Sequence, residues 1–217
     1  MTNDEVRRTT VTVALGATGI LLVIAAAAGL GLSGPHPLGI DSAWLDFVDT
    51  HRVPALESIA LALNYIGGTL SMTIISVVVV IVFLVLRRFR DAITVGLSVG
   101  LATAISTLIK LALGRPRPLG GVTDVETSSF PSGHATAAAA LTVALTLVFS
   151  RAWLWALAAI WIVAMALSRT YLMVHWASDV MAGAVLGASV AVVVFTLTRW
   201  SSVDRASAHQ TRRGVQP

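Results

Sequence analysis

The stretch SRTYLMVHWASD, residues 168–179, places an arginine, a histidine and an aspartate between two long apolar runs. Those runs, residues 152–171 and 177–199, each approach or exceed the roughly 20 apolar residues that a helix needs to cross a bilayer. Ionisable groups at membrane depth are expensive to keep there and are usually functional. The sequence therefore predicts a membrane protein with a polar site between its last two spans.

The composition of the whole chain also favours a membrane protein. Of its 217 residues, 56% are hydrophobic and 12% are charged, and the mean hydropathy is +0.83. These values exclude an ordinary soluble globular domain. The net charge of +4 does not indicate nucleic-acid binding, because the basic residues sit at the ends of apolar runs, where orientation in the bilayer explains them. The chain has no cysteine, which excludes disulfides and thiolate metal sites.

Six apolar runs predict an all-α integral membrane protein of one domain, residues 1–217. The expected spans are 11–32, 69–86, 92–113, 132–149, 152–171 and 177–199. The first is interpreted as an uncleaved anchor rather than a signal peptide, because it is longer than a typical signal-peptide core and five more spans follow.

The polar segments between and after the spans predict smaller elements. Residues 41–47 predict a short capped amphipathic helix at the interface, and residues 54–66 a short helix that lies on or dips into the membrane. The polar residues 201–217 predict a disordered cytoplasmic tail.

The distribution of basic residues predicts the orientation of the chain. With the N-terminus in the cytoplasm, ten lysines and arginines lie inside and five outside, which satisfies the positive-inside bias. Both termini are then cytoplasmic and the membrane is the plasma membrane. The loops after the first, third and fifth spans share the outer face, so we expect the polar clusters of these loops to meet on the extracytoplasmic side.

The first of these clusters has the pattern K-x6-R-P. Lys110 lies near the end of the third span, and Arg117 and Pro118 follow just beyond it. Prolines stiffen this segment. Such cations either contact lipid headgroups or bind a phosphate, and the two partner clusters favour phosphate. Arg115 is a further cation here, which would favour a diphosphate substrate or face lipid headgroups; the sequence leaves both open.

The second cluster is Pro131-Ser132-Gly133-His134, directly before an Ala-rich span. Ser132 is a natural N-cap, and Gly133 lets a ligand approach the backbone closely. The N-terminus of a helix is a ready anion site. A phosphate bound there would place His134 within reach of a leaving oxygen.

The third cluster adds Ser168-Arg169, His175 and Asp179. On a helix, His175 and Asp179 are i and i+4 and share a face. The carboxylate would accept the proton of one ring nitrogen and leave the other free to attack. A His–Asp pair within a helix is also a common structural bond, but the two neighbouring clusters favour catalysis.

Together the three clusters resemble the tripartite signature of the type 2 phosphatidic acid phosphatases, which are integral membrane lipid phosphate phosphatases. Vanadium haloperoxidases and some acid phosphatases share this signature. The resemblance implies that His175 is a nucleophile that forms a phosphohistidine and that Asp179 orients it. His134 would protonate the leaving oxygen and then activate water. The implied phosphate-binding residues are Lys110, Arg117, Ser132, Gly133 and Arg169.

This scheme requires neither a metal nor another cofactor. The other nearby carboxylates, Asp124 and Glu126, are assigned to a solvated loop. Because the two histidines need opposite protonation states, we expect activity to peak in the mildly acidic to neutral range.

The expected partners are the bilayer and a membrane lipid phosphate, with no nucleic acid. A polyprenyl (undecaprenyl) diphosphate is the first choice of substrate. Phosphatidic acid, diacylglycerol diphosphate and phosphatidylglycerol phosphate are alternatives. A non-catalytic phospholipid-binding or transport protein is the alternative from another class, and the oligomeric state stays open.

Overall fold

The computed structural model describes residues 2–122 and 128–213, apart from the side chains of residues 69 and 201–213. This part of the chain forms eight helices and no strand. The helices are α1 Asn3–Ser33, α2 Gly39–Thr50, α3 Pro54–Ile66, α4 Thr69–Val85, α5 Phe89–Leu113, α6 Gly133–Phe149, α7 Ala152–Tyr171 and α8 Ala177–Arg213.

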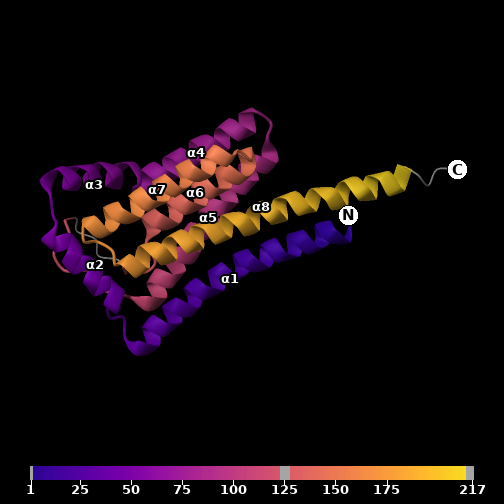
Figure 1. Cartoon of the computed structure of the whole chain (residues 1–217). Coiled ribbons are helices and arrows are strands. Elements are labelled where there is room, and N and C mark those ends of the chain that lie inside the picture. The colour runs from indigo at the N-terminus through magenta and orange to yellow at the C-terminus, as the bar shows by residue number, and fades with distance from the viewer. Residues whose placement is uncertain (1, 123–127, 214–217) are drawn as a thin grey trace.

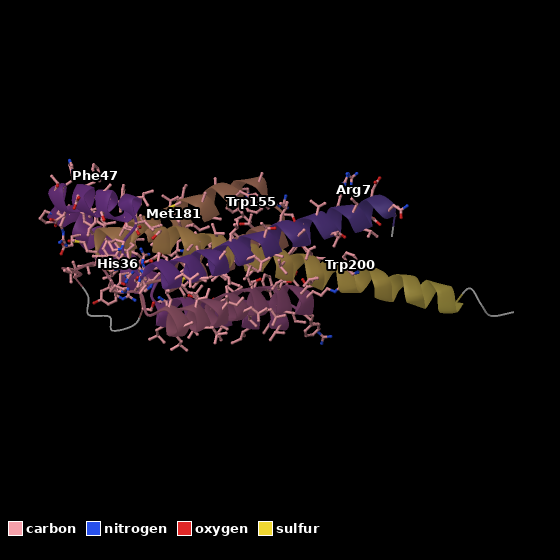
Figure 2. The ribbon with its side chains drawn as sticks, turned by 90° about the horizontal axis from the view of Figure 1, so that it is seen from below. Arg7, His36, Phe47, Trp155, Met181 and Trp200 are labelled. Atoms are coloured by element: carbon pink, nitrogen blue, oxygen red, sulfur yellow. The ribbon has the colours of Figure 1, made fainter. Side chains whose placement is uncertain are left out.

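The long helices run roughly along one axis, and α1 lies beside α8 (Figure 1). The start of α1 and the end of α8 lie at the same end of this bundle, and α2 and α3 lie at the opposite end (Figure 1). Figure 2 shows the same separation, with Arg7 at one end and His36 and Phe47 at the other. The polar segments around 114–122 and 172–176 therefore share the end of the bundle that carries α2 and α3.

The all-α membrane fold predicted from the sequence is confirmed, but the number of spans is not fixed at six. Among the described residues, four helices (α1, α5, α7 and α8) are long and apolar enough to cross a membrane. A fifth candidate combines Pro54–Ile66 with Leu70–Val85, which meet at an angle of 47°. Helix α6 is apolar but has only 17 residues. The second and fourth predicted spans are thus helical, but each is short on its own.

The smaller predicted elements have mixed outcomes. Helices are present at both segments expected near the interface, as α2 and α3. The backbone of α8 continues as a helix to Arg213, so the disordered tail predicted from Ser201 was wrong for residues 201–213. Extension of an existing helix adds one hydrogen bond for each residue fixed, which favours continuation beyond the apolar run. Residues 214–217 lie outside the described part of the chain.

Two glycines let α8 approach the start of α6. A Cβ atom added at Gly183 would lie 2.5 Å from the backbone oxygen of Ser132, and one added at Gly187 would clash with the backbone of Thr136. Small residues four apart permit this close packing between membrane helices. The backbone N–H of Ser132 also donates to the carbonyl of Asp179 at 2.9 Å. The second and third sequence clusters are therefore held directly against each other.

Candidate active site

The three sequence clusters converge at the end of the bundle that α2 and α3 cover. The first comes from the end of α5 and the segment after it, the second from the start of α6, and the third from the end of α7 and the start of α8. Hydrogen bonds and electrostatic interactions connect seven of the predicted site residues, which are Lys110, Arg117, Ser132, His134, Arg169, His175 and Asp179. The eighth, Gly133, lines the same cavity as Lys110 and His134.

His175 occupies the short segment between α7 and α8 and is only 3% exposed. Its Nε2 lies 3.2 Å from Nη1 of Arg117. A guanidinium only donates hydrogen bonds, so Nε2 must be the acceptor and carry the lone pair. The proton is then on Nδ1, which lies 3.5 Å from Oδ2 of Asp179. This is the tautomer that leaves Nε2 free to attack.

The electrostatic environment keeps the ring of His175 neutral. Burial, with smaller contributions from the charges of Arg117 and Lys110, lowers the pKa of His175 to about 4 against the opposing effect of Asp179. At neutral pH the ring is therefore uncharged. A histidine that attacks phosphorus needs this form.

Lys110 and Arg117 are held side by side by one backbone carbonyl. Nζ of Lys110 donates to the carbonyl of Ser128 at 2.6 Å, and Nη2 of Arg117 donates to the same oxygen at 3.3 Å. Nη1 of Arg117 also donates to the carbonyl of Val174 at 2.5 Å. These bonds fix two cations beside the ring of His175.

The third cation, Arg169, is buried near the end of α7 and is anchored by a residue that the sequence did not single out. Its Nη1 donates to Oδ1 of Asn64 on α3. Arg169 is close enough to Lys110 and His134 to interact with both electrostatically. Asn64 lies in an apolar helix and carries no motif of its own, so the sequence offered no signal for this contact.

The start of α6 presents polar groups that the described residues leave without a partner. Ser132 is the N-cap residue by position, but its side chain makes no capping hydrogen bond, contrary to the role predicted for it. Its buried Oγ, Nε2 of His134 and Nε of Arg169 have no hydrogen-bond partner among residues 2–122 and 128–213. The first N–H groups of a helix also lack intrahelical partners. Together these groups suit a bound anion.

Arg115 lies between two carboxylates, so the alternative in which it faces lipid headgroups was wrong. Its Nη2 lies 2.7 Å from Oδ2 of Asp41, its Nη1 lies 2.5 Å from Oδ1 of Asp179, and all three side chains are fully buried. Two carboxylates without water around them need a cation. Arg115 meets this need inside the protein and does not face lipid headgroups.

A cavity of about 370 Å³ adjoins the site between α4, α5 and α6. Lys110 and His134 line its polar end, and its apolar walls include Met72, Val99 and Leu111. Asp124 and Glu126 lie outside the described residues. Within the described ranges, no three or more His, Asp or Glu side chains are grouped so that they could hold a metal ion.

Comparison with known proteins adds the family. The sequence model of the PAP2 superfamily matches residues 91–202, just over half of the chain. The chain belongs to the PAP2 superfamily. The resemblance seen in the three sequence clusters is thereby confirmed.

This PAP2 chain has relatives among proteins of known activity. It is 40% identical over 113 residues to the decaprenylphosphoryl-5-phosphoribose phosphatase of Mycobacterium tuberculosis, which covers 50% of the chain and 62% of that protein. It is 27% identical over 164 residues to the undecaprenyl-diphosphatase of Sulfolobus acidocaldarius, which covers 72% of the chain and 77% of the relative. The chain thus spans less than two thirds of the length of the mycobacterial relative.

Two solved structures share the PAP2 fold seen here. The PAP2-type phosphatidylglycerolphosphate phosphatase of Bacillus subtilis superposes with a TM-score of 0.69 at 22% identity, over 87% of this chain and 96% of its own. Aquifex aeolicus LpxE superposes with a TM-score of 0.64 at 19% identity, over 72% of this chain and 95% of its own. At these identities the likeness is one of fold.

Proposed function

We propose that this PAP2 chain hydrolyses a lipid phosphate or diphosphate through a phosphohistidine on His175, without a metal ion. One observation carries the proposal. Nε2 of the neutral, buried ring faces Arg117, while Nδ1 faces Asp179. A lone pair is thus held beside cations that bind phosphoryl oxygens, with a carboxylate behind the ring.

In the first step, the lone pair of His175 Nε2 attacks phosphorus and the bond from phosphorus to the leaving oxygen breaks. His134 donates its proton to that oxygen, so that the lipid leaves as an alcohol or a phosphate monoester. The ring of His175 becomes positively charged as the phosphorus–nitrogen bond forms. The carboxylate of Asp179, 3.5 Å from Nδ1, stabilises this charge.

In the second step, His134 takes a proton from water and the resulting hydroxide attacks the phosphohistidine. The phosphorus–nitrogen bond breaks, inorganic phosphate leaves, and both histidines return to their starting states. The charge on the phosphoryl oxygens is stabilised in both steps by preorganised donors. These donors are Lys110, Arg117, Arg169, Ser132 Oγ and the N–H of Gly133.

The proposed substrate is a polyprenyl diphosphate. The names of two relatives, from Mycobacterium tuberculosis and Sulfolobus acidocaldarius, both specify polyprenyl substrates. The cavity of about 370 Å³ beside Lys110 and His134 supports a long apolar tail next to the phosphate. Phosphatidic acid, diacylglycerol diphosphate and phosphatidylglycerol phosphate are the lipid alternatives. The proposed setting is the plasma membrane, with cytoplasmic termini and an outward-facing site, as the basic residues favour.

The test is phosphate release by the purified protein from a panel of these lipids, with the His175→Ala variant alongside. We expect wild-type turnover to be fastest with undecaprenyl diphosphate. The variant should lose turnover and still bind inorganic phosphate, because the cations remain. A wild-type protein that binds phosphate but releases none from any member of the panel would be a binding or transport protein instead.

A further inference from the structure

The carboxylate of Asp41 is buried in the interior although α2 is a short helix at the end of the bundle. Its Oδ1 accepts from the N–H of Ser178 at 2.8 Å, and its Oδ2 accepts from Oγ of Ser178 at 2.8 Å and from the N–H of Leu38 at 2.9 Å. Its side chain is fully buried. Asp41 is thus fixed to the first turn of α8, the turn that also carries Asp179.

Arg115 joins this carboxylate to Asp179. One guanidinium nitrogen, Nη2, meets Asp41 at 2.7 Å, and the other, Nη1, meets Asp179 at 2.5 Å and Oγ of Ser178 at 2.8 Å. The planar fork of an arginine serves two acceptors in fixed directions. The position of Oδ1 of Asp179 is therefore set by Arg115, and that of Arg115 by Asp41.

The second oxygen of Asp179 is fixed by the segment that carries His175. Oδ2 accepts from the N–H of Trp176 at 2.9 Å and lies 3.5 Å from Nδ1 of His175. A carboxylate held at both oxygens has little freedom to rotate away from the ring. The chain of contacts from α2 to the ring is Asp41, Arg115, Asp179 and His175.

We propose that Asp41 and Arg115 are positioning residues, which hold Asp179 and through it keep Nε2 of His175 aimed at the phosphate. This inference rests on the proposed function of His175. Neither residue belongs to the eight predicted site residues. They act through Asp179 and touch neither the phosphate nor the attacking nitrogen.

The ionisation of the pair also matters for the charge on His175. Burial raises the pKa of Asp41, but the N–H groups of Ser178 and Leu38 and the guanidinium of Arg115 together lower it below its usual value. Asp41 and Arg115 therefore form a neutral pair at the pH of catalysis. Asp41→Asn would leave Arg115 paired with Asp179 alone, and Arg115→Gln would leave two buried carboxylates without their shared cation.

Loss of Asp41 and loss of Arg115 should move the acid limb of kcat/KM in opposite directions. The other charged or titratable groups around His175 are Asp179, Lys110, Arg117, His134 and Arg169, and they remain the same in both variants. Without the negative charge of Asp41, the protonated ring is less stable and the acid limb of kcat/KM moves to lower pH. Without the positive charge of Arg115, it moves to higher pH. A merely structural defect would not move the limb in opposite directions.

The experiment compares pH profiles of phosphate release from one lipid substrate by the full-length chain in detergent. Asp41→Asn should move the acid limb to lower pH. It should lower kcat by about tenfold, taken from the lower end of the loss caused by removing an outer partner of a metal-binding histidine. Arg115→Gln should move the acid limb to higher pH. In the double variant, the acid limb should return to its wild-type pH, while kcat should stay low. The matched control is Asp46→Asn, the same change at an exposed position of α2, which should leave the profile unchanged.

The experiment distinguishes failure of the proposed function from failure of the positioning role. A wild-type protein that is inactive toward every lipid overturns the proposed function. If the wild type is active and Asp41→Asn has the same kcat and the same acid limb, only the positioning role is overturned. If Asp41→Asn and Arg115→Gln do not fold, Ser178→Ala decides, because it removes a hydroxyl between the two residues without changing charge. It should lower kcat without moving the limb, and an unchanged kcat would overturn the inference.

Discussion

Nη1 of Arg117 lies 3.2 Å from Nε2 of His175, so the ring nitrogen beside the cation is the one that carries the lone pair. A cation in contact with the proposed nucleophile competes for the same lone pair. The ring is kept neutral mainly by burial, and the charge of Arg117 adds to this effect. In the proposed mechanism, a bound phosphate takes over the hydrogen bonds of Arg117 and releases the lone pair.

This relationship predicts an acid limb of kcat/KM at low pH. The pKa of His175 is lowered to about 4, mainly by burial. Below this value the ring gains a proton and loses its lone pair, so kcat/KM should fall with a group of pKa near 4, once the separate titration of the substrate is taken into account. In the pH profile of kcat, the acid limb should lie at higher pH than in the profile of kcat/KM, because a bound phosphate anion favours the protonated ring. A kcat/KM limb at the ordinary histidine pKa of about 6.5 would contradict the burial argument.

Substitution of the two histidines should have different effects on turnover. His134→Ala should lower lipid phosphate turnover by about 10²–10⁴-fold, the usual contribution of a general acid or base. With p-nitrophenyl phosphate, whose leaving group needs no proton, this variant should still release one equivalent of nitrophenol and then stall as the phosphohistidine. His175→Ala should show no such burst. Rapid-mixing absorbance measurements separate the two outcomes, and a burst in both variants would remove His175 from the role of nucleophile.

Activity should not depend on a divalent metal. The proposed donors for the phosphoryl oxygens are three basic side chains, a hydroxyl and a backbone N–H, so turnover should continue in excess EDTA. The measurement is the rate of phosphate release before and after dialysis against chelator. A complete loss that magnesium restores would show that the cations are not sufficient.

Close packing of α8 on α6 predicts a large effect of a single methyl group. Gly183→Ala should lower the free energy of unfolding by about 1–3 kcal/mol, as overpacking of a tight contact does, because the new Cβ would lie 2.5 Å from the carbonyl of Ser132. The matched control is Gly100→Ala in α5, where nothing lies within 4 Å of the new Cβ. That variant should be neutral or more stable by up to about 1 kcal/mol. Thermal unfolding in detergent checks both, and equal stabilities would refute the contact.

The cavity beside the site predicts a variant that distinguishes lipid from soluble substrates. Thr103 lines this cavity, and Thr103→Trp should fill it and raise KM for a long-chain lipid phosphate. The same variant should hydrolyse p-nitrophenyl phosphate at the wild-type rate. Leu101→Trp, on the same helix at an exposed position outside the cavity lining, is the control. Equal losses on both substrates would place the tail elsewhere.

The sequence predicted the helices well because each apolar run is a local property. Each of the six expected spans coincides with a helix whose bounds differ from the prediction by a few residues, apart from the extensions of α1 and α8 toward the chain ends. The convergence of the three clusters could also be predicted, since it needs only the count of membrane crossings. The number of helices that cross the bilayer unaided could not, because α4 and α6 have only 17 residues each.

The parts of the site that were missed depend on pairing between distant residues. Asp41 and Arg115 are 74 positions apart, and Asp41 lies in a segment whose pattern is that of an interfacial helix. Only the fold shows that its carboxylate points inward. The same holds for Asn64 and Arg169, which are 105 positions apart. Ser132 was assigned as a cap from its residue type and does occupy the N-cap position, but its hydroxyl makes no hydrogen bond to the helix backbone.

The position of Asp41 divides the site between two parts of the chain. The PAP2 match begins at residue 91, so all eight predicted site residues lie on the C-terminal side of that point, whereas Asp41, which pairs with Arg115, lies on the N-terminal side. A chain severed between α3 and α4 would keep every signature residue in one fragment and the balancing carboxylate in the other. During synthesis, Asp41 emerges before Arg115 and Asp179, because it precedes both in the sequence. If Asp41 has the proposed positioning role, full activity therefore requires contact between the part of the chain before residue 91 and the part that carries the site residues.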